Sequence, residues 1–240
     1  MARVDEIAPD VYRICTFAES VNLQFCQFLI DDEEPLLYHT GMRRGFDAVR
    51  DAVAEVIDPT TVRWLAFSHF EADECGALNE WLELAPRAEP MCSVVAGEVS
   101  VNDFAIRPAH ELTDGATFET GKFRWRFLHT PHMPHAWDAG HLFEETQRVL
   151  LCSDVLNQDG DVPPLSESDV VGPMRSQLES YRGMPFDYYL PYTTRTSGQI
   201  ERLAQLEPEW CATMHGSSFH GDGAGALRAM DAMLQELAEG

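Results

Sequence analysis

Short apolar runs separated by polar turns divide the first third of the chain into predicted strands. Residues 11–15, 23–30 and 35–39 form three such runs, and Asp, Glu and Ser occupy the turns between them. Runs bounded in this way are typical of strands, so we expect an antiparallel meander at the start of the chain. A fourth run, at 62–67, is mostly apolar and predicts a buried strand.

Helical spacing of apolar residues alternates with these runs. Phe46, Val49, Val53 and Val56 lie on one face of a helix predicted over 44–57, which would pack on the sheet. Further helices are expected at 76–84, 173–182, 199–206 and 224–237, and further strands at 123–128, 149–154 and 209–214. This mixture of strands and helices indicates an α/β fold.

The strand predicted at 62–67 leads directly into a polar segment with three candidate metal ligands. His69, Glu71 and Asp73 alternate along this segment, so in an extended chain their side chains point to the same side. Asp73 also lies near the start of the next predicted helix, where a carboxylate can cap the helix. Considered alone, the segment is explained equally well as a polar loop at the end of a strand.

Later segments favour a site, because each places a His or Asp next to an apolar run. The strand at 123–128 is followed by four histidines, at positions 129, 132, 135 and 141. His135 is the preferred ligand because Asp138 is close in sequence and 19 positions separate it from Asp154, and His132 is the second choice. The other two are expected to support or border the site.

Two more candidates end the last apolar runs of the chain. Asp154 closes the run at 149–154, and His215 follows the run at 209–214. A lone Asp at the end of a strand is also a common loop cap, so Asp154 is a candidate ligand mainly because the other candidates accompany it. A carboxylate in such a group can share its two oxygens between two cations.

These residues resemble the metal-binding pattern of the metallo-β-lactamase superfamily, and within it the di-iron domain of flavodiiron proteins. Hydrolases of the superfamily usually show His-x-His-x-Asp-His, whereas the flavodiiron pattern is His-x-Glu-x-Asp-His, and Glu71 stands at the second position here. The sequence is most similar to the flavin-free, oxygen-binding di-iron proteins. The resemblance implies a metallo-β-lactamase-like αββα sandwich, with two mixed sheets flanked by helices. It also implies six metal ligands, with Asp154 as the bridging carboxylate: His69, Glu71, Asp73, His135, Asp154 and His215.

Glu74 departs from this pattern, in which a His closes the motif. Its carboxylate either binds the second metal or turns away and leaves a water there. We favour turning away, because a residue directly after Asp73 at a helix start points off the ligand face, and a fourth carboxylate would make the site net negative. His39, where the family often has Asp, is expected to be a core or supporting histidine rather than a ligand.

Charge and composition exclude several function classes. Asp plus Glu number 40 against 17 for Lys plus Arg, a net charge of −23, and such a surface repels phosphate backbones and anionic lipids. We therefore expect no nucleic acid and no membrane partner. No apolar run approaches the roughly 20 residues of a membrane span, and the first residues do not resemble a signal peptide, which predicts a cytoplasmic protein. Without an evident linker, residues 1–240 are expected to form a single domain.

The six cysteines occur singly, with no C-x-x-C pair, and most lie in apolar runs. We expect them to be reduced and to pack as small apolar side chains. Cys75 adjoins the metal motif, but packing is the favoured interpretation there too.

The predicted ligands indicate the metal and two classes of function. Three imidazoles and three carboxylates suit iron or manganese better than zinc, so we expect two Fe ions and a non-haem di-iron protein that binds or reduces O2, with NO and peroxide as other candidate ligands. No flavin site is visible, so the protein would be an oxygen sensor or would depend on an electron-donor or signalling protein. A homodimer is a further hypothesis. The alternative function is a binuclear metal-dependent hydrolase of the same superfamily.

Overall fold

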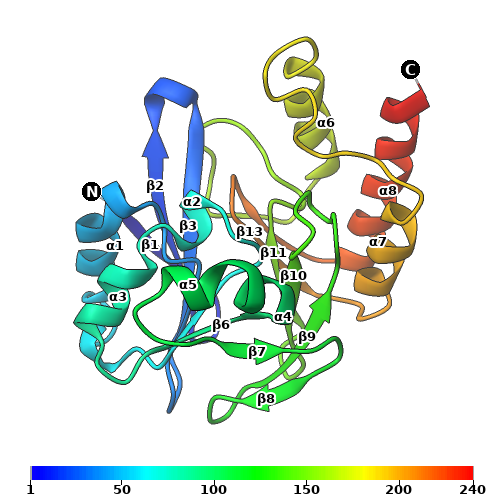
Figure 1. Cartoon of the computed structure of the whole chain (residues 1–240). Coiled ribbons are helices and arrows are strands. Elements are labelled where there is room, and N and C mark those ends of the chain that lie inside the picture. Colours follow the sequence, from blue (N-terminus) through cyan, green and yellow to red (C-terminus); the bar gives the residue numbers. More distant parts are fainter. Residues whose placement is uncertain (1, 240) are drawn as a thin grey trace.

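The computed structural model describes residues 2–239, and within this range the strands form two mixed sheets of seven strands each (Figure 1). In the first sheet the strands follow chain order; β1 to β4 pair antiparallel and β4 to β7 pair parallel. Its strands are β1 (Arg3–Ala8), β2 (Val11–Ala18), β3 (Leu23–Ile30), β4 (Leu36–Tyr38), β5 (Trp64–Ala66), β6 (Glu89–Ser93) and β7 (His110–Leu112).

The second sheet has the order β12-β14-β13-β11-β10-β9-β8. The pairs β12/β14 and β11/β13 are parallel, and the other neighbours are antiparallel. Its strands are β8 (Thr117–Glu119), β9 (Arg124–His129), β10 (Gly140–Glu144), β11 (Val149–Ser153), β12 (Leu165–Ser166), β13 (Trp210–Thr213) and β14 (Ser218–His220).

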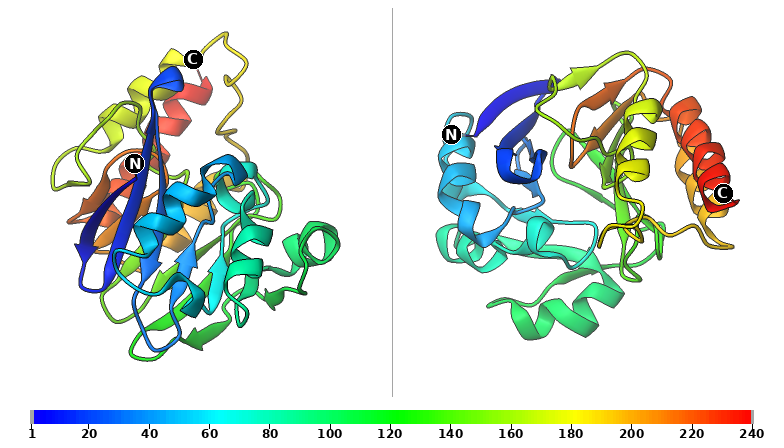
Figure 2. Two further views of the ribbon diagram at one scale, coloured as in Figure 1. Left: turned by 90° about the vertical axis from the view of Figure 1, so that its left-hand side faces the viewer. Right: turned by 90° about the horizontal axis from the view of Figure 1, so that it is seen from above.

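Helices cover the outer face of each sheet, which gives four layers (Figure 2). Apolar side chains of α1 and α3 pack on the first sheet, and those of α6, α7 and α8 pack on the second. The helices are α1 (Phe46–Val53), α2 (Ala72–Cys75), α3 (Leu78–Leu84), α4 (Val94–Ala96), α5 (Asn102–Phe104), α6 (Val171–Ser180), α7 (Thr196–Ala204) and α8 (Gly223–Glu239). The prediction of two mixed sheets flanked by helices is therefore confirmed.

Alternation of side chains along the strands produces the layers. Phe28 and Ile30 of β3 enter the core between the sheets, together with Trp125 of β9, whereas Leu29 faces the outer helices. Because β3 is buried on both faces, apolar residues occupy both alternating positions of 23–30, interrupted only by the buried Gln24 and Gln27.

The predicted meander is confirmed, since β2, β3 and β4 pair antiparallel in sequence order. The helix expected at 44–57 is shorter and ends at Val53, and the helix expected at 76–84 begins at Leu78, after the separate short helix α2. Sequence patterns did not predict the strands β1, β6, β7, β8, β10, β12 and β14. No helix within residues 2–239 is both long enough and apolar enough to cross a membrane.

Candidate metal centre

Three strand ends meet at one edge of the sandwich and carry the candidate ligands. His69 follows β5, Asp154 follows β11, and His215 follows β13. All three side chains are buried, at 1%, 4% and 4% exposure. The polar segment after β5 therefore lies over the edge of the second sheet, and the predicted residues come together from both sheets.

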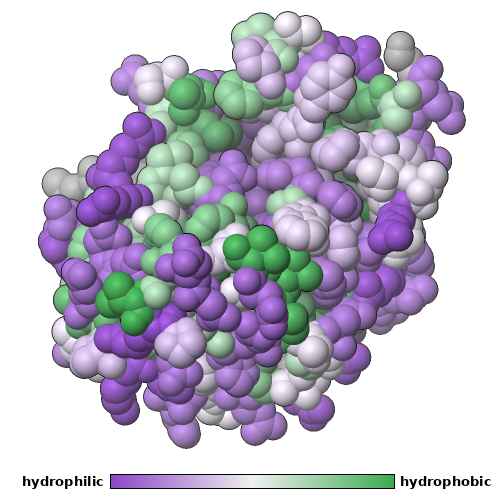
Figure 3. Space-filling model, viewed as in Figure 1, coloured by the Kyte–Doolittle hydropathy of each residue, from purple (hydrophilic) through white to green (hydrophobic). Residues whose placement is uncertain are grey.

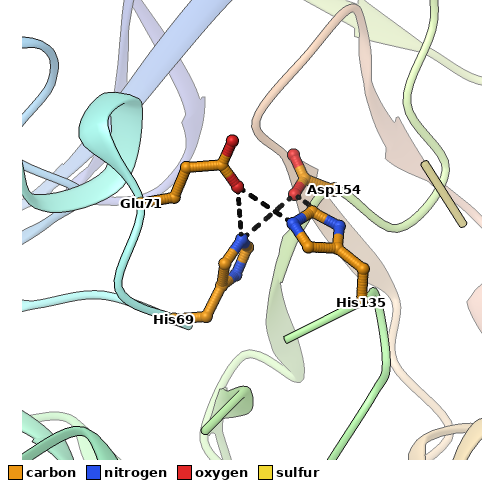
Figure 4. Close-up of side chains that lie close together, drawn as sticks. All are labelled: His69, Glu71, His135 and Asp154. Atoms are coloured by element: carbon orange, nitrogen blue, oxygen red, sulfur yellow. Dashed lines mark hydrogen bonds and ion pairs between the residues drawn. The ribbon is translucent and has the colours of Figure 1, made fainter. Parts of the chain in front are cut away.

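Four of the six predicted ligands form a first group (Figure 4). One ligand atom from each of His69, Glu71, His135 and Asp154 lies within 4.8 Å of the others. Oε2 of Glu71 is 3.0 Å from Nε2 of His69 and 2.9 Å from Nε2 of His135. Glu71 and His135 are partly exposed, so this group has a buried floor and a rim open to solvent.

The other two predicted ligands form a second group, which shares Asp154 with the first. Nε2 of His215 is 3.5 Å from Oδ2 of Asp73 and 3.2 Å from Oδ1 of Asp154. The other oxygen of Asp154, Oδ2, lies 3.7 Å from Nε2 of His69. The two oxygens of this carboxylate thus face different groups, which is the geometry that a bridging ligand requires.

Backbone contacts orient the second group. The Nδ1 nitrogen of His215 is 2.7 Å from the carbonyl oxygen of Gln24 on β3, so Nε2 is directed at the carboxylates. Gly216 follows with φ +98°, and a Cβ there would lie 2.7 Å from the Cβ of Gln158, so only glycine fits this turn. The neighbouring strand end turns at Ser153, whose φ of 50° is left-handed, and the turn directs Asp154 inward.

The loop that carries His135 is fixed to the first sheet. The backbone N–H of Phe70 donates to Oδ2 of Asp138 at 2.9 Å, and that of Gly140 donates to the carbonyl of Ser68 at 3.0 Å. These two bonds hold the 130–139 loop against the motif segment. His135 points into the group, and its buried Nδ1 atom has no hydrogen-bond partner among the described residues.

His132, the second choice from sequence, lies outside both groups. Its ring is exposed, and Nδ1 is 3.1 Å from the carbonyl oxygen of His135. The geometry therefore brings together the preferred six side chains. Their role as ligands remains a prediction, because distances between side chains do not identify an ion.

Glu74 turns back behind His69. Its Oε2 accepts the backbone N–H groups of Ser68 and His69, both at 2.8 Å, and its Oε1 lies 3.2 Å from Nδ1 of His69. Ser153 donates its hydroxyl to the same Oε1. The carboxylate thus faces the ring nitrogen of His69 that points away from the group, in keeping with the expectation that Glu74 turns away.

Charge pairing dominates the protonation of the site. Burial lowers the pKa of His69, but the carboxylates of Glu74, Glu71 and Asp154 outweigh it and raise this pKa to about 10. Burial likewise opposes a rise at His215, yet Asp154 and Asp73 raise its pKa to about 10. Hydrogen bonds from His135 and His69 lower the pKa of Glu71 to about 2. Glu71 is thus ionised and positioned to balance a cation, whereas burial raises the pKa of Glu74 to about 8.

Two histidines near the site are neutral supports. Burial lowers the pKa of His39 to about 3 and that of His141 to about 4. His141 joins the hydroxyl of Thr130 to the carbonyl of Cys152, at 2.8 and 3.2 Å. His39 places Nε2 3.4 Å from Oε1 of Glu74, which agrees with its predicted supporting role.

Tyr189 is a further neighbour of the site. Its ring lies 5.4 Å from that of His135, in the segment between α6 and α7. Burial raises the pKa of this phenol well above its usual value, and the charge of Asp154 acts in the same direction. An aromatic-rich segment was the available signal, but it does not reveal which of its rings reaches the site.

The outer surface near the site is mixed in character. Figure 3 shows mostly hydrophilic side chains, with apolar ones over the α4 and α5 region. Val99, Phe104 and Ile106 are exposed there, and Phe70 of the motif segment contacts Phe104 edge to face with ring centres 5.4 Å apart.

Comparison with known proteins finds a matching family model and related sequences. The sequence model described as "ODP family beta lactamase" matches residues 23–216. The rubredoxin-oxygen oxidoreductase of Megalodesulfovibrio gigas is 25% identical over 203 residues, which cover 81% of this chain and 48% of that protein. The flavo-diiron protein FprA2 of Clostridium acetobutylicum is 22% identical over 196 residues, 79% of this chain and 48% of that protein.

A solved structure of rubredoxin oxygen:oxidoreductase from Desulfovibrio gigas shares the fold, with a TM-score of 0.81 and 21% identity over 97% of this chain and 61% of that one. The chain spans about half the length of the curated relatives that it matches. The likeness in structure concerns the fold, and the residues matched by the sequence model, 23–216, include all six predicted ligands.

Proposed function

We propose, because this chain belongs to the ODP family of beta-lactamase-like proteins, that it is a non-haem di-iron protein that binds or reduces dioxygen. The observation that carries the proposal is the arrangement of six side chains in two groups that share Asp154. One group would hold each iron. The names of the matched relatives, an oxygen oxidoreductase and a flavo-diiron protein, support the same chemistry.

The donor atoms fit two iron ions. His69, Glu71 and His135 would complete the first site, and Asp73 and His215 the second, with one oxygen of Asp154 in each. Imidazole and carboxylate donors suit iron, and the unpartnered Nδ1 of His135 leaves that ring free to turn toward a cation. Three carboxylates against two divalent ions leave a small positive charge, which one hydroxide would neutralise.

The surrounding residues orient these donors. The Gln24 carbonyl fixes the ring of His215, and the Glu74 carboxylate lies 3.2 Å from Nδ1 of His69, so that Nε2 of each ring faces the site. Glu71 and His135, on the open rim, lie where a small molecule such as O2 enters. Two ferrous ions would supply two electrons, whereas reduction of O2 to water takes four.

A partner must therefore supply electrons for continued reduction of O2. The M. gigas relative has rubredoxin in its name, which supports a small electron-transfer protein as the donor; a signalling partner, for a sensor of O2, is the other form of the proposal. The strongly acidic surface, with a net charge of −23, would repel a donor of the same sign, so contact would be made through uncharged or basic patches. Partner identity and a homodimer remain hypotheses.

The test begins with the metal content of the protein after anaerobic loading with Fe²⁺. We expect about two iron ions per chain, and a rapid change in the optical spectrum when O2 is added, with little O2 consumed per site unless a reductant is present. Asp154→Ala should lose iron from both groups, because each contains an oxygen of this carboxylate. Asp169→Ala, in an exposed loop, is the matched control.

Two outcomes would overturn the proposal. Full iron occupancy in Asp154→Ala would show that the two groups are not joined by this residue. A colourless zinc protein that ignores O2 but hydrolyses an ester or thioester would identify the binuclear hydrolase instead.

A further inference from the structure

Three residues of the first sheet lie in a row on the face that meets the second sheet. Arg3 on β1 is paired in register with Cys15 on β2, and Cys15 is paired with Cys26 on β3. Directly opposite residues on antiparallel strands have Cα atoms about 4.5–5.5 Å apart. That spacing lies within the range of about 4.4–6.8 Å that a disulfide spans, so the backbone positions already suit a bond between Cys15 and Cys26.

A buried cation lies along this row. Arg13 is 0% exposed, and its Nη2 donates to Oε1 of Gln24 at 2.7 Å and to the carbonyl of Gly216 at 2.8 Å. Gln24 pairs with Phe17, two positions beyond Cys15 along β2. To reach Gln24 from position 13, the Arg13 side chain extends past Cys15 and Cys26.

The charge of Arg13 is incompletely balanced. Its Nε and Nη1 atoms are buried and have no hydrogen-bond partner among the described residues. Asp5 pairs with it at 3.8 Å and is one-third exposed, so this bridge is long and partly wet. A buried guanidinium needs an anion close by, and a thiolate on the neighbouring cysteine would serve as one.

Other contacts distinguish the two thiols. Arg3 donates from Nη2 to Sγ of Cys15 at 3.6 Å. A hydrogen bond from Cys26, together with Arg13 and Arg3, holds the pKa of Cys15 below its usual value although burial opposes this, whereas burial raises the pKa of Cys26 well above its own. Cys15 also lies next to the half-exposed side chain of Arg3, while Cys26 lies one strand deeper.

We propose that Cys15 and Cys26 form a thiol pair that hydrogen peroxide oxidises to a disulfide across β2 and β3. The Cys15 thiolate attacks one oxygen of the peroxide; an S–O bond forms, the O–O bond breaks, and hydroxide leaves to be protonated. The Cys26 thiol then loses its proton and attacks the Cys15 sulfur, which releases the second oxygen as water. Two thiols lose two electrons, and one peroxide becomes two waters.

The pair is connected to the candidate metal centre through β3. The backbone N–H of Cys26 donates to the carbonyl of Met214 at 2.9 Å, beside His215, and Gln24 contacts His215 through its own carbonyl. The reaction itself requires no metal and does not rest on the proposed di-iron function.

The chain contains its own control pair. Cys152 on β11 and Cys211 on β13 are also buried in adjacent strands, but Cys211 is paired in register with Leu150, two positions before Cys152. Burial and the neighbouring thiol of Cys211 raise the pKa of Cys152 well above its usual value, although a backbone hydrogen bond from Ala212 opposes this. This pair should remain reduced under conditions that oxidise Cys15 and Cys26.

The experiment uses the full chain, reduced and treated with chelator, and exposes it to about ten equivalents of hydrogen peroxide before alkylation and peptide mass spectrometry. We expect two of the six thiols to be lost, in a linked peptide that joins Cys15 to Cys26 and that dithiothreitol separates. In Cys26→Ala, dimedone should trap a sulfenic acid on Cys15. Full alkylation of all six thiols after peroxide, or a bond between Cys152 and Cys211 instead, would overturn the proposal.

A charge variant at the half-exposed Arg3, which also pairs with Asp161, tests the role of the cations. Arg3→Gln removes an exposed guanidinium from Cys15 and should slow disulfide formation about threefold or more, because the thiolate loses a donor. Arg124→Gln, an exposed arginine on β9, is the matched control and should leave the rate unchanged. Equal rates in the wild type and in Arg3→Gln would show that Arg3 does not activate Cys15.

Discussion

Replacing Glu74 with Gln tests whether this residue positions His69 or binds metal itself. The carboxylate makes five contacts: two backbone N–H groups at 2.8 Å, the Ser153 hydroxyl, and the rings of His69 and His39 at 3.2 and 3.4 Å. A Gln side chain of the same shape can keep its oxygen on the two N–H groups. Its NH2 group then faces the N–H at Nδ1 of His69, so that two hydrogen-bond donors oppose each other.

The magnitude is worked from the reversed contact with His69. A hydrogen bond with one charged partner contributes about 1.5–3 kcal/mol. Since about 1.4 kcal/mol corresponds to a factor of ten, the affinity for iron in the first group should fall roughly 10- to 100-fold. Loss of a residue that orients a metal-binding histidine typically has an effect of the same size.

The assay is anaerobic titration with Fe²⁺ against a competing chelator, followed by iron analysis at saturation. We expect Glu74→Gln to bind two irons per chain at saturation, with a weakened first site. Glu83→Gln, an exposed carboxylate on α3, should match the wild type. The reasoning fails if the affinity of Glu74→Gln is unchanged, and loss of one iron at saturation would show that Glu74 is a ligand.

Two further predictions concern histidines at the same site. His135→Ala should weaken iron binding at least tenfold. His132→Ala should change it less than about twofold, because the exposed ring of His132 lies outside both groups. If a chelator competition gave the reverse order, His132 would be the ligand and His135 would not. In the metal-free protein, the raised pKa values of His69 and His215, about 10, contribute stability that is fully present below about pH 6.5 and is lost as the pH rises toward 10. The difference in Tm between iron-loaded and metal-free protein should therefore grow from pH 6.5 to 9.5, and a constant or shrinking difference would contradict the charge pairing.

The sequence revealed those features that depend on spacing along one segment. The apolar run at 23–30 predicted β3 with the bounds that the structure has. His69, Glu71 and Asp73 are revealed by alternate spacing, because an extended segment projects alternate side chains to one side. Asp154 and His215 stand at strand ends, and strands whose ends share one edge of a sandwich bring such residues together.

The missed elements are ones in which tertiary contacts outweigh local pattern. β6 contains Glu89 and Pro90, which are poor strand formers, yet it pairs parallel with β5 and β7 inside the sheet. The segment from 94 to 104 forms short helical turns that no apolar periodicity marks. β10 is buried along its whole length, and its histidine and glutamate obscured the apolar run.

The ligands and their supports differ in what a sequence can show of them. Only a few types of side chain bind metal ions, so candidate ligands can be recognised in the sequence. The support of His215 is the carbonyl of Gln24, a group that every residue has, and the support of the His135 loop is made partly by backbone N–H groups. Glu74 is the exception, since a buried carboxylate is needed to meet Nδ1 of His69 and two N–H groups at once. Its place directly after Asp73 at a helix start predicted that the side chain points off the ligand face, and its direction in the fold agrees, but the groups that it contacts there are visible only in the structure.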